Sequence, residues 1–364
     1  MNPTGLLLVM LAVPGGVYDT PAPAGAPRLA FYLPDNTCPF SIKDGVAEPI
    51  PFKSFDTRFG ALGNIANPKA IGDAKNDRLA ILKRLAARGS RATTPEQAAG
   101  MAAEQIRLNN LDAALNTLAP FTRAEPGDFR VLINQAHAFA SRNDWDAAIR
   151  FHEQAVLGRP GFPREIPGIK PDQLAWLQTV EKRYYTKWLA IHRLNTVSKP
   201  NPETDVPFPL FGDMKFVNAE GAYEPGKLAP DERKKLPPDA IAIVQQLLLW
   251  SPGDTSLYWL LGELYAAEGS FEEAKTIFDR CVDTRQFSNR KLLKEHRAVL
   301  AETLANQPKP AAPSPPPQPD PWAGLPSKRT VYIILGAFAP IAMLLVIFQL
   351  RALRKRIARK PTGS

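Results

Sequence analysis

The residues whose types could support catalysis or metal binding are few in this chain and are scattered along it. The sequence contains four histidines and two cysteines. They are His137, His152, His192 and His296, with Cys38 and Cys281. No HExxH, GxSxG, P-loop or GxGxxG pattern is present, and two cysteines are too few for a disulfide framework or a cysteine-based zinc site. The sequence therefore predicts no cofactor, no metal and no enzyme. A disulfide between the cysteines would need an oxidising compartment; alternatively, both are thiols and Cys281 is a buried helix residue.

The net charge of +9 is concentrated close to the C-terminus. Eight basic residues flank an apolar segment there, and they are Lys328, Arg329, Arg351, Arg354, Lys355, Arg356, Arg359 and Lys360. Without these eight, the chain has 37 basic and 36 acidic residues. Because the remainder is balanced, the basic character indicates the orientation of a membrane segment, and no nucleic acid is expected as a partner.

The apolar segment at residues 330–350 is predicted to cross a membrane. It begins at Thr330, ends at Leu350 and contains no charged residue. A helix of this length spans about 30 Å, the hydrocarbon thickness of a bilayer. Most of the flanking positive charge follows the segment, so the tail at 351–364 is expected in the cytoplasm. The preceding chain is then expected in the periplasm or an equivalent extracytoplasmic space.

The N-terminal residues are expected to provide the export signal that this topology requires. Residues 5–13 (GLLLVMLAV) form an apolar core of signal-peptide length, and Ala22-Pro23-Ala24 resembles a cleavage site. No lysine or arginine precedes Arg28, so the usual positive region is missing. We assign residues 1–24 to a signal peptide. Residues 307–326 are proline-rich, which predicts an extended polyproline linker between the exported part and the membrane.

A 34-residue period runs through the middle of the chain. Ala114 and Ala148 are 34 residues apart, as are Pro126 and Pro160. A second register carries the same spacing, through the pairs Ala240 and Ala274, Val244 and Phe278, and Leu247 and Cys281. Small residues at such positions allow two antiparallel helices to approach closely, and aromatic residues fill the space between hairpins. The pattern predicts stacked helical hairpins.

This pattern resembles that of tetratricopeptide-repeat proteins. The clearest unit, residues 255–286, carries the family spacing at Tyr258, Leu261, Gly262, Tyr265, Ala274 and Phe278. Residues 129–160 fit nearly as well, and residues 95–128 fit more weakly. A second-helix pattern recurs in residues 237–254 (PPDAIAIVQQLLLWSPGD) without a recognisable partner helix before it.

The resemblance implies that the first helix of each hairpin lines a groove that binds a protein or peptide. The residues that would face this groove are Arg130, Ile133, Asn134, His137, Ser141, Ser256, Trp259, Glu263 and Ala267. The family's lysine–asparagine clamp for a C-terminal carboxylate is absent at the corresponding positions. We predict Trp259 as an interaction anchor. The alternative is that Trp259 packs against the neighbouring hairpin.

Several segments do not follow the repeat pattern. Residues 171–197 are predicted to form one long amphipathic helix, whose apolar stripe packs against the repeats and consists of Leu174, Leu177, Tyr184, Trp188 and Ile191. Residues 73–87 and 288–305 are also predicted to be helical. Residues 198–238 contain eight prolines together with aromatic residues, which predicts an irregular insertion that packs onto the repeats. Residues 29–50 could form one or two short strands.

The predicted fold class is therefore all-α: tetratricopeptide-like helical hairpins interrupted by a proline-rich insertion, with one C-terminal transmembrane helix. The expected parts are a signal peptide (1–24), an N-terminal accessory region (25–90), two repeats (95–160), the long helix and insertion (161–238), further repeats with a capping helix (239–306), the linker (307–326), the membrane helix (330–350) and the basic tail (351–364).

The predicted function is an anchored protein-interaction scaffold without catalysis. Two alternatives stay open: an enzyme whose site follows no motif, in residues 25–90 or in the insertion, and a structural envelope protein that self-associates. A strongly shifted carboxylate or histidine pKa in a deep pocket of those two segments would favour the enzyme.

Overall fold

The computed structural model describes residues 38–89, 91–158, 161–166, 169–197, 208–283 and 290–306, together with Arg351. The chain divides into two units, Met1–Asn306 and Gln307–Ser364. All helices and strands discussed below belong to the first unit. The predicted signal peptide, linker and membrane helix lie outside the described residues. Within the part that is described, no helix is both long enough and apolar enough to cross a membrane.

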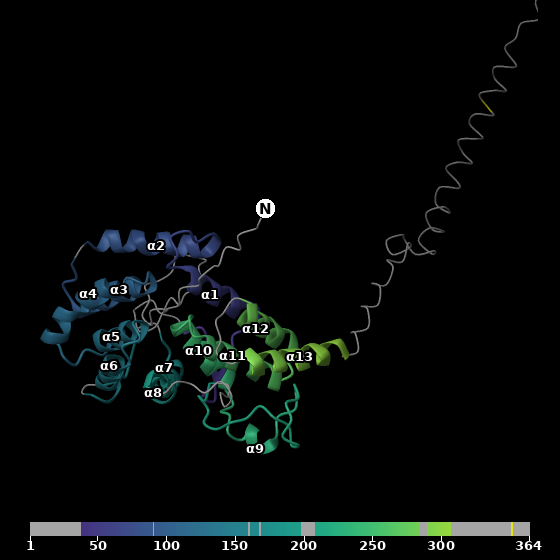
Figure 1. Ribbon diagram of the computed structural model, residues 1–364. Helices are drawn as coiled ribbons and strands as arrows, with labels where there is room; N and C mark the ends of the chain where they lie inside the picture. Colours follow the sequence, from purple (N-terminus) through teal and green to yellow (C-terminus); the bar gives the residue numbers. More distant parts are fainter. Residues whose placement is uncertain are drawn as a thin grey trace, which may run out of the picture. The chain divides into compact units, whose positions relative to one another are not determined.

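The described part of the first unit is mostly helical and contains antiparallel helical hairpins (Figure 1). The predicted hairpins are α3 (Pro95–Arg107) with α4 (Leu111–Ala124), α5 (Phe129–Ser141) with α6 (Trp145–Leu157), and α11 (Thr255–Ala267) with α12 (Phe271–Asp283). Each first helix begins at a side-chain cap that accepts a backbone N–H: Thr94, Asp128 and Asp254. Such caps satisfy backbone donors that the first helical turn leaves without partners.

The turn between the two helices repeats in all three hairpins. Asn109, Asn143 and Gly269 occupy equivalent turn positions and have φ angles of 60°, 58° and 81°. Asparagine and glycine tolerate this left-handed conformation better than other residues. The two asparagines are 34 residues apart, so the turn follows the period that the sequence predicted.

Gly262 shows why a small residue is required inside a hairpin. A Cβ atom built at this position would lie 2.6 Å from Phe278 and 3.0 Å from Ile277. Both neighbours are fully buried. The close approach of α11 and α12 therefore depends on the absence of a side chain at residue 262.

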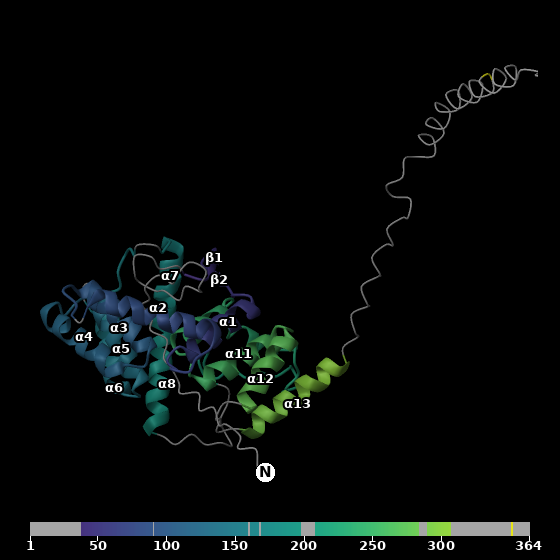
Figure 2. The same cartoon turned by 90° about the horizontal axis from the view of Figure 1, so that it is seen from above.

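The long helix predicted at 171–197 is confirmed in its extent but is not uniform. It consists of α7 (Pro171–Thr179), a π-helical segment η1 (Val180–Tyr185) and α8 (Thr186–Val197). Its predicted apolar stripe is buried at Leu174, Leu177, Tyr184 and Trp188. A π-helical turn inside an α-helix often occurs at a functional site. In both views this helix lies between the hairpins α3–α6 and the C-terminal helices (Figures 1 and 2).

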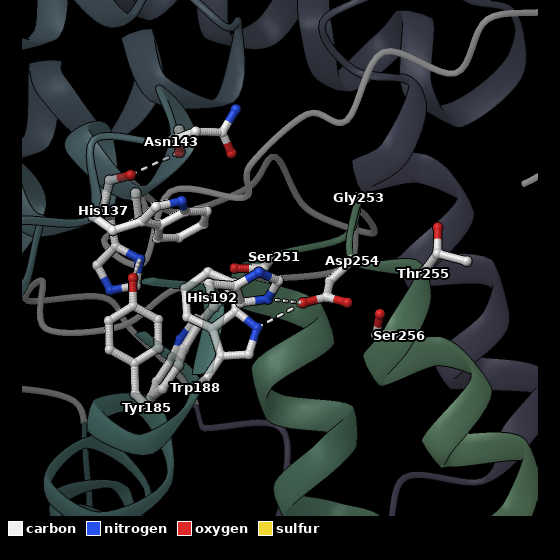
Figure 3. Close-up of a pocket in the computed structure, with 14 residues that line it drawn as sticks. His137, Asn143, Tyr185, Trp188, His192, Ser251, Gly253, Asp254, Thr255 and Ser256 are labelled. Carbon is white, nitrogen blue, oxygen red and sulfur yellow. Dashed lines mark hydrogen bonds and ion pairs between the residues drawn. The ribbon is translucent and has the colours of Figure 1, made fainter. Parts of the chain in front are cut away.

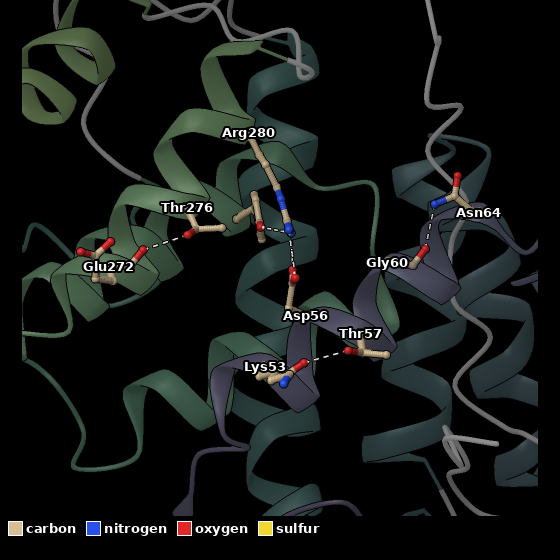
Figure 4. Close-up of polar contacts among 9 residues, drawn as sticks. Lys53, Asp56, Thr57, Gly60, Asn64, Glu272, Thr276 and Arg280 are labelled. Carbon is tan, nitrogen blue, oxygen red and sulfur yellow. Dashed lines mark hydrogen bonds and ion pairs between the residues drawn. The ribbon is translucent and has the colours of Figure 1, made fainter. Parts of the chain in front are cut away.

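Residues 52–64 of the N-terminal region pack on the C-terminal hairpin, which is far away in sequence. Residues 72–88 lie beside α3, where Arg84 and Arg88 pair with Glu104. The strands β1 (Ser41–Lys43) and β2 (Val46–Glu48) pair antiparallel, and two helices follow, α1 (Phe52–Asn64) and α2 (Gly72–Arg88). Helix α1 was not foreseen from the sequence. Its Asp56 accepts two hydrogen bonds from the guanidinium of Arg280 on α12 (Figure 4). Phe59 stacks on Tyr258 of α11, with ring centroids 4.9 Å apart.

The remaining helices cover the C-terminal hairpin. They are α9 (Pro230–Arg233), α10 (Ala240–Trp250) and α13 (Arg290–Asn306). The described part of the insertion packs, as predicted: the Gly226 N–H donates to the Ala266 carbonyl at 2.8 Å. The ring of Tyr223 stacks on His296 of α13, with centroids 3.6 Å apart. Cys38 and Cys281 are both buried thiols, and no disulfide joins them.

Candidate functional site

A cavity of about 250 Å³ lies where the first group of hairpins meets α8 and the start of α11 (Figure 3). Its lining comes from α5, the turn after α5, α6, η1, α8, the end of α10, the turn between α10 and α11, and the start of α11. The lining residues are His137, Ala140, Ser141, Asn143, Trp145, Tyr185, Trp188, His192, Trp250, Ser251, Gly253, Asp254, Thr255 and Ser256. Neither lysine nor arginine is among them.

Aromatic rings in mutual contact form one wall of this cavity. Trp145 stacks on His192 with ring centroids 4.8 Å apart, and its edge meets Trp188 at 5.7 Å. Tyr185 stacks on Trp188 at 5.1 Å and meets Trp250 at 5.6 Å. Because every ring is held by at least one other, the wall is rigid and apolar with a few polar edges.

Asp254 fixes the polar side of the cavity. Its carboxylate accepts hydrogen bonds from the Leu257 backbone N–H at 2.9 Å and from the Trp188 indole at 2.6 Å, and it contacts His192 Nε2 at 2.7 Å. Burial alone would raise the pKa of Asp254, but His192 and the two N–H donors hold it below its ordinary value. A single carboxylate therefore caps α11 and orients both Trp188 and His192.

A buried polar cluster extends inward from two lining residues of the cavity, His137 and Tyr185. The Tyr185 hydroxyl is 2.9 Å from His137 Nδ1. His137 Nε2 and His152 Nε2 each lie 3.8 Å from Glu181 Oε1. All four side chains are at most 2% exposed.

Burial favours the neutral form of each group in this cluster. It lowers the pKa of His137 well below its ordinary value, with a further contribution from His152, and lowers the pKa of His152 to about 3. It raises the pKa of Glu181 well above its ordinary value. Both Glu181 oxygens and both Nε2 atoms make no hydrogen bond within the described structure. No group of His, Cys, Asp or Glu among the described residues is arranged to hold a metal ion.

Three of the predicted groove residues line this cavity. His137 and Ser141 come from α5, and Ser256 comes from the first turn of α11. Residues of two separate hairpins therefore meet at one site. The repeat pattern alone did not predict where these hairpins would meet.

The other predicted groove residues lie elsewhere. Ile133 and Asn134 are fully buried, and the Asn134 amide donates to the Ala99 carbonyl of α3 at 3.1 Å. Arg130 lines a different cavity, of about 680 Å³, and pairs with Glu96 and Asp128.

Trp259 and Glu263 are buried and contact each other. The Trp259 indole donates to Glu263 Oε1 at 2.7 Å, and the same oxygen lies 2.6 Å from His296 Nδ1 on α13. Trp259 is therefore buried and contacts His296 of α13, whereas the alternative to an anchor placed it against the neighbouring hairpin. Ala267 is also buried. Binding of a partner by the predicted groove residues stays a prediction.

The residues that dominate the cavity wall were not selected from the sequence. Trp188 was interpreted as part of a core stripe, and Trp145, Tyr185, Trp250 and Asp254 were not assigned to any site. One signal was available: Glu181, Tyr185, Trp188 and His192 recur at three- and four-residue steps, so they share one helix face. This face differs from a purely apolar packing face because it also carries Glu181, and glutamate is rarely fully buried.

Stacked antiparallel hairpins with a recurring left-handed turn define a helical-repeat protein. Residues 131–164 match the family model described as a tetratricopeptide repeat. This match and the observed hairpins together support the assignment to the tetratricopeptide-repeat family. The repeat suggests a protein–protein interaction scaffold. No curated protein and no solved structure gives a significant match.

Proposed function

We propose that this protein is a scaffold, held at a membrane by residues 330–350, that binds a partner protein in the cavity between α5 and α11 on the extracytoplasmic side. The chain would position its partner and would not catalyse a reaction. The observation that carries this proposal is the composition of the cavity: five lining residues, His137, Ala140, Ser141, Asn143 and Trp145, belong to the matched repeat.

The chemistry of the cavity favours one bulky apolar side chain of the partner. Pockets for drug-sized molecules measure roughly 300–1,000 Å³, and this cavity is smaller at about 250 Å³. The rings of Trp145 and Trp188, which meet edge to face, provide an apolar surface. Ser141, Ser251 and Ser256 provide hydrogen-bonding groups around it. Buried aromatic pockets surrounded by polar groups are typical of the centre of protein interfaces.

The proposal is tested by filling the cavity. Ser141→Trp and Ser256→Trp each place a large ring at a half-buried lining position, and Ser54→Trp introduces the same ring at an exposed position on α1. Proteins crosslinked to the full chain in membranes are identified for the wild type and the three variants. We expect the two cavity variants to lose a partner that the wild type and Ser54→Trp retain. A partner list shared by all four proteins would contradict the proposal.

The membrane part of the proposal rests on the charge distribution around residues 330–350. Six basic residues follow this segment and two immediately precede it, which favours a cytoplasmic C-terminus. Protease added from the cytoplasmic side should therefore remove only the basic tail and leave the hairpins intact. Cleavage within α11 under these conditions would show that the chain has the opposite orientation in the membrane.

A further inference from the structure

A second cavity, of about 310 Å³, lies where the insertion meets η1 and α8. Its lining residues are Arg183, Tyr184, Lys187, Leu210, Phe211, Gly212, Lys234, Lys235, Leu236 and Pro237. Four of these carry a positive charge, and no acidic residue is among them. The cavity is separate from the one between α5 and α11, and no lining residue is shared.

The four cations differ in how their charge is balanced. Lys234 pairs with Asp231 at 2.9 Å, and Lys235 pairs with Glu232 at 3.1 Å and with Asp213 at 3.3 Å. Arg183 and Lys187, in contrast, form no ion pair with any residue that the structure describes.

Arg183 and Lys187 also repel each other. They are one helical turn apart, so both face the same cavity. The pKa of Lys187 is lowered, first by burial and then by the positive charge of Arg183. Two like charges held together without a counter-ion favour an anion that satisfies both.

Aromatic and aliphatic side chains form the rest of the lining. Tyr184 and Phe211 meet edge to face with ring centroids 5.9 Å apart, and the Arg183 guanidinium lies 5.4 Å from the Tyr184 ring centre. Leu210 is buried and Leu236 is half-buried. An inorganic ion would leave this apolar surface unused, whereas an anion attached to a small organic group would cover it.

We propose that this cavity binds a phosphate monoester, with Arg183 and Lys187 holding the phosphate oxygens and Tyr184 and Phe211 packing against the organic part. Guanidinium groups form paired hydrogen bonds with phosphate, and a lysine ammonium adds a compact second charge. The same chemistry fits a soluble phosphate ester or the headgroup of an anionic phospholipid. The insertion contributes seven of the ten lining residues, so this proposal gives the segment that interrupts the repeats a role in binding.

The test uses the full chain in detergent and measures binding by calorimetry. Phenyl phosphate and inorganic phosphate are compared first. We expect phenyl phosphate to bind more tightly, and Arg183→Gln and Lys187→Gln each to weaken its binding at least tenfold, because each removes a charge-assisted hydrogen bond. Lys182→Gln is the matched control: it removes a neighbouring charge outside the lining and should change the affinity less than about twofold.

Short-chain phosphatidic acid, measured beside phosphatidylcholine of the same chain length, distinguishes the source of the phosphate. Arg183-dependent binding of phosphatidic acid tighter than that of phenyl phosphate identifies a lipid headgroup; the reverse order identifies a soluble ester. Absence of binding by both phosphates, or equal loss in the Lys182→Gln control, would overturn the proposal. Unchanged melting temperatures of the variants would show that the loss is local.

Discussion

The carboxyl group of Glu181 lies at 0% exposure between two buried histidines, and none of the three is in direct hydrogen-bond contact with another. Burial disfavours the charged form of each. Burial lowers the pKa of His152 to about 3. Neutral His152 therefore leaves the free energy of unfolding undiminished above pH 6.5, and this free energy falls as the pH drops below 6.5. The pH dependence is opposite for Glu181, because burial raises its pKa. The free energy of unfolding is undiminished below pH 4.5 and falls as the pH rises toward the raised pKa of the folded state.

Glu181→Gln should therefore stabilise the protein at alkaline pH. The amide cannot ionise, so the variant avoids a cost of up to about 1.4 kcal/mol per pH unit above the unfolded-state pKa. Urea unfolding of the full chain at pH 6 and pH 8, followed by tryptophan fluorescence, measures the effect. The exposed Glu153→Gln is the control and should leave the pH dependence as in the wild type. A Glu181→Gln variant that loses stability from pH 6 to pH 8 as steeply as the wild type would disprove this account.

Two neighbouring buried glutamines on α10 allow a second prediction at the residue scale. The Gln245 amide accepts from the Ile50 N–H and donates to the Ile50 carbonyl, each at 2.8 Å. The Gln246 amide makes no hydrogen bond within the described structure. Gln245→Leu should cost about 2–4 kcal/mol because it leaves two buried backbone groups without partners, whereas Gln246→Leu should be neutral or stabilising. Equal free energies of unfolding for the two variants would contradict the role of Gln245 in holding the N-terminal segment.

The hairpins were predictable from sequence because their packing is local. Close approach of two consecutive helices requires a small residue at a fixed spacing. Gly262, Ala136 and Ala148 are such residues, so the requirement can be recognised in the sequence. The recurring turn at Asn109 and Asn143 follows the same 34-residue period. The family-model match over residues 131–164 agrees with the repeat predicted at 129–160.

Gly262→Ala tests this packing at the scale of one hairpin. Its new methyl group would lie 2.6 Å from the buried ring of Phe278, and overpacking of this kind typically costs about 1–3 kcal/mol. Gly60→Ala on α1 is the control, because no atom lies within 4 Å of its Cβ position. There alanine should stabilise the helix by roughly 0.5–1 kcal/mol. Thermal unfolding that shifts in the same direction for both variants would contradict the account.

Helix α1 and the π-helical segment could not be read from the sequence, because both depend on distant contacts. Residues 52–64 carry no repeat pattern, and the position of α1 is set by Arg280 and Tyr258, which lie more than 190 residues further along the chain. The π-helical turn at residues 180–185 places Glu181 and Tyr185 beside His137 and His152 of another hairpin. Local periodicity does not encode such contacts.

At the scale of the whole molecule, the cavity forms only because two groups of hairpins meet across a single long helix. The family resemblance placed His137, Ser141 and Ser256 in a groove, and the structure brings these three together. It could not foresee that Trp259 is buried and contacts α13, or that Trp145 and Trp188 line the cavity in its place. These contacts form between helices of different repeats and segments, so the pattern within one repeat does not predict them.

Site-specific photocrosslinking tests the central claim most directly. A benzophenone amino acid is introduced in the full chain at Ser141, at Ser256 and, as a control, at the exposed Ser54, and cells are irradiated. The account predicts the same partner protein joined to the chain from Ser141 and from Ser256, and no such product from Ser54. Equal crosslinking of that partner from all three positions, or no protein product from either cavity position, would contradict it.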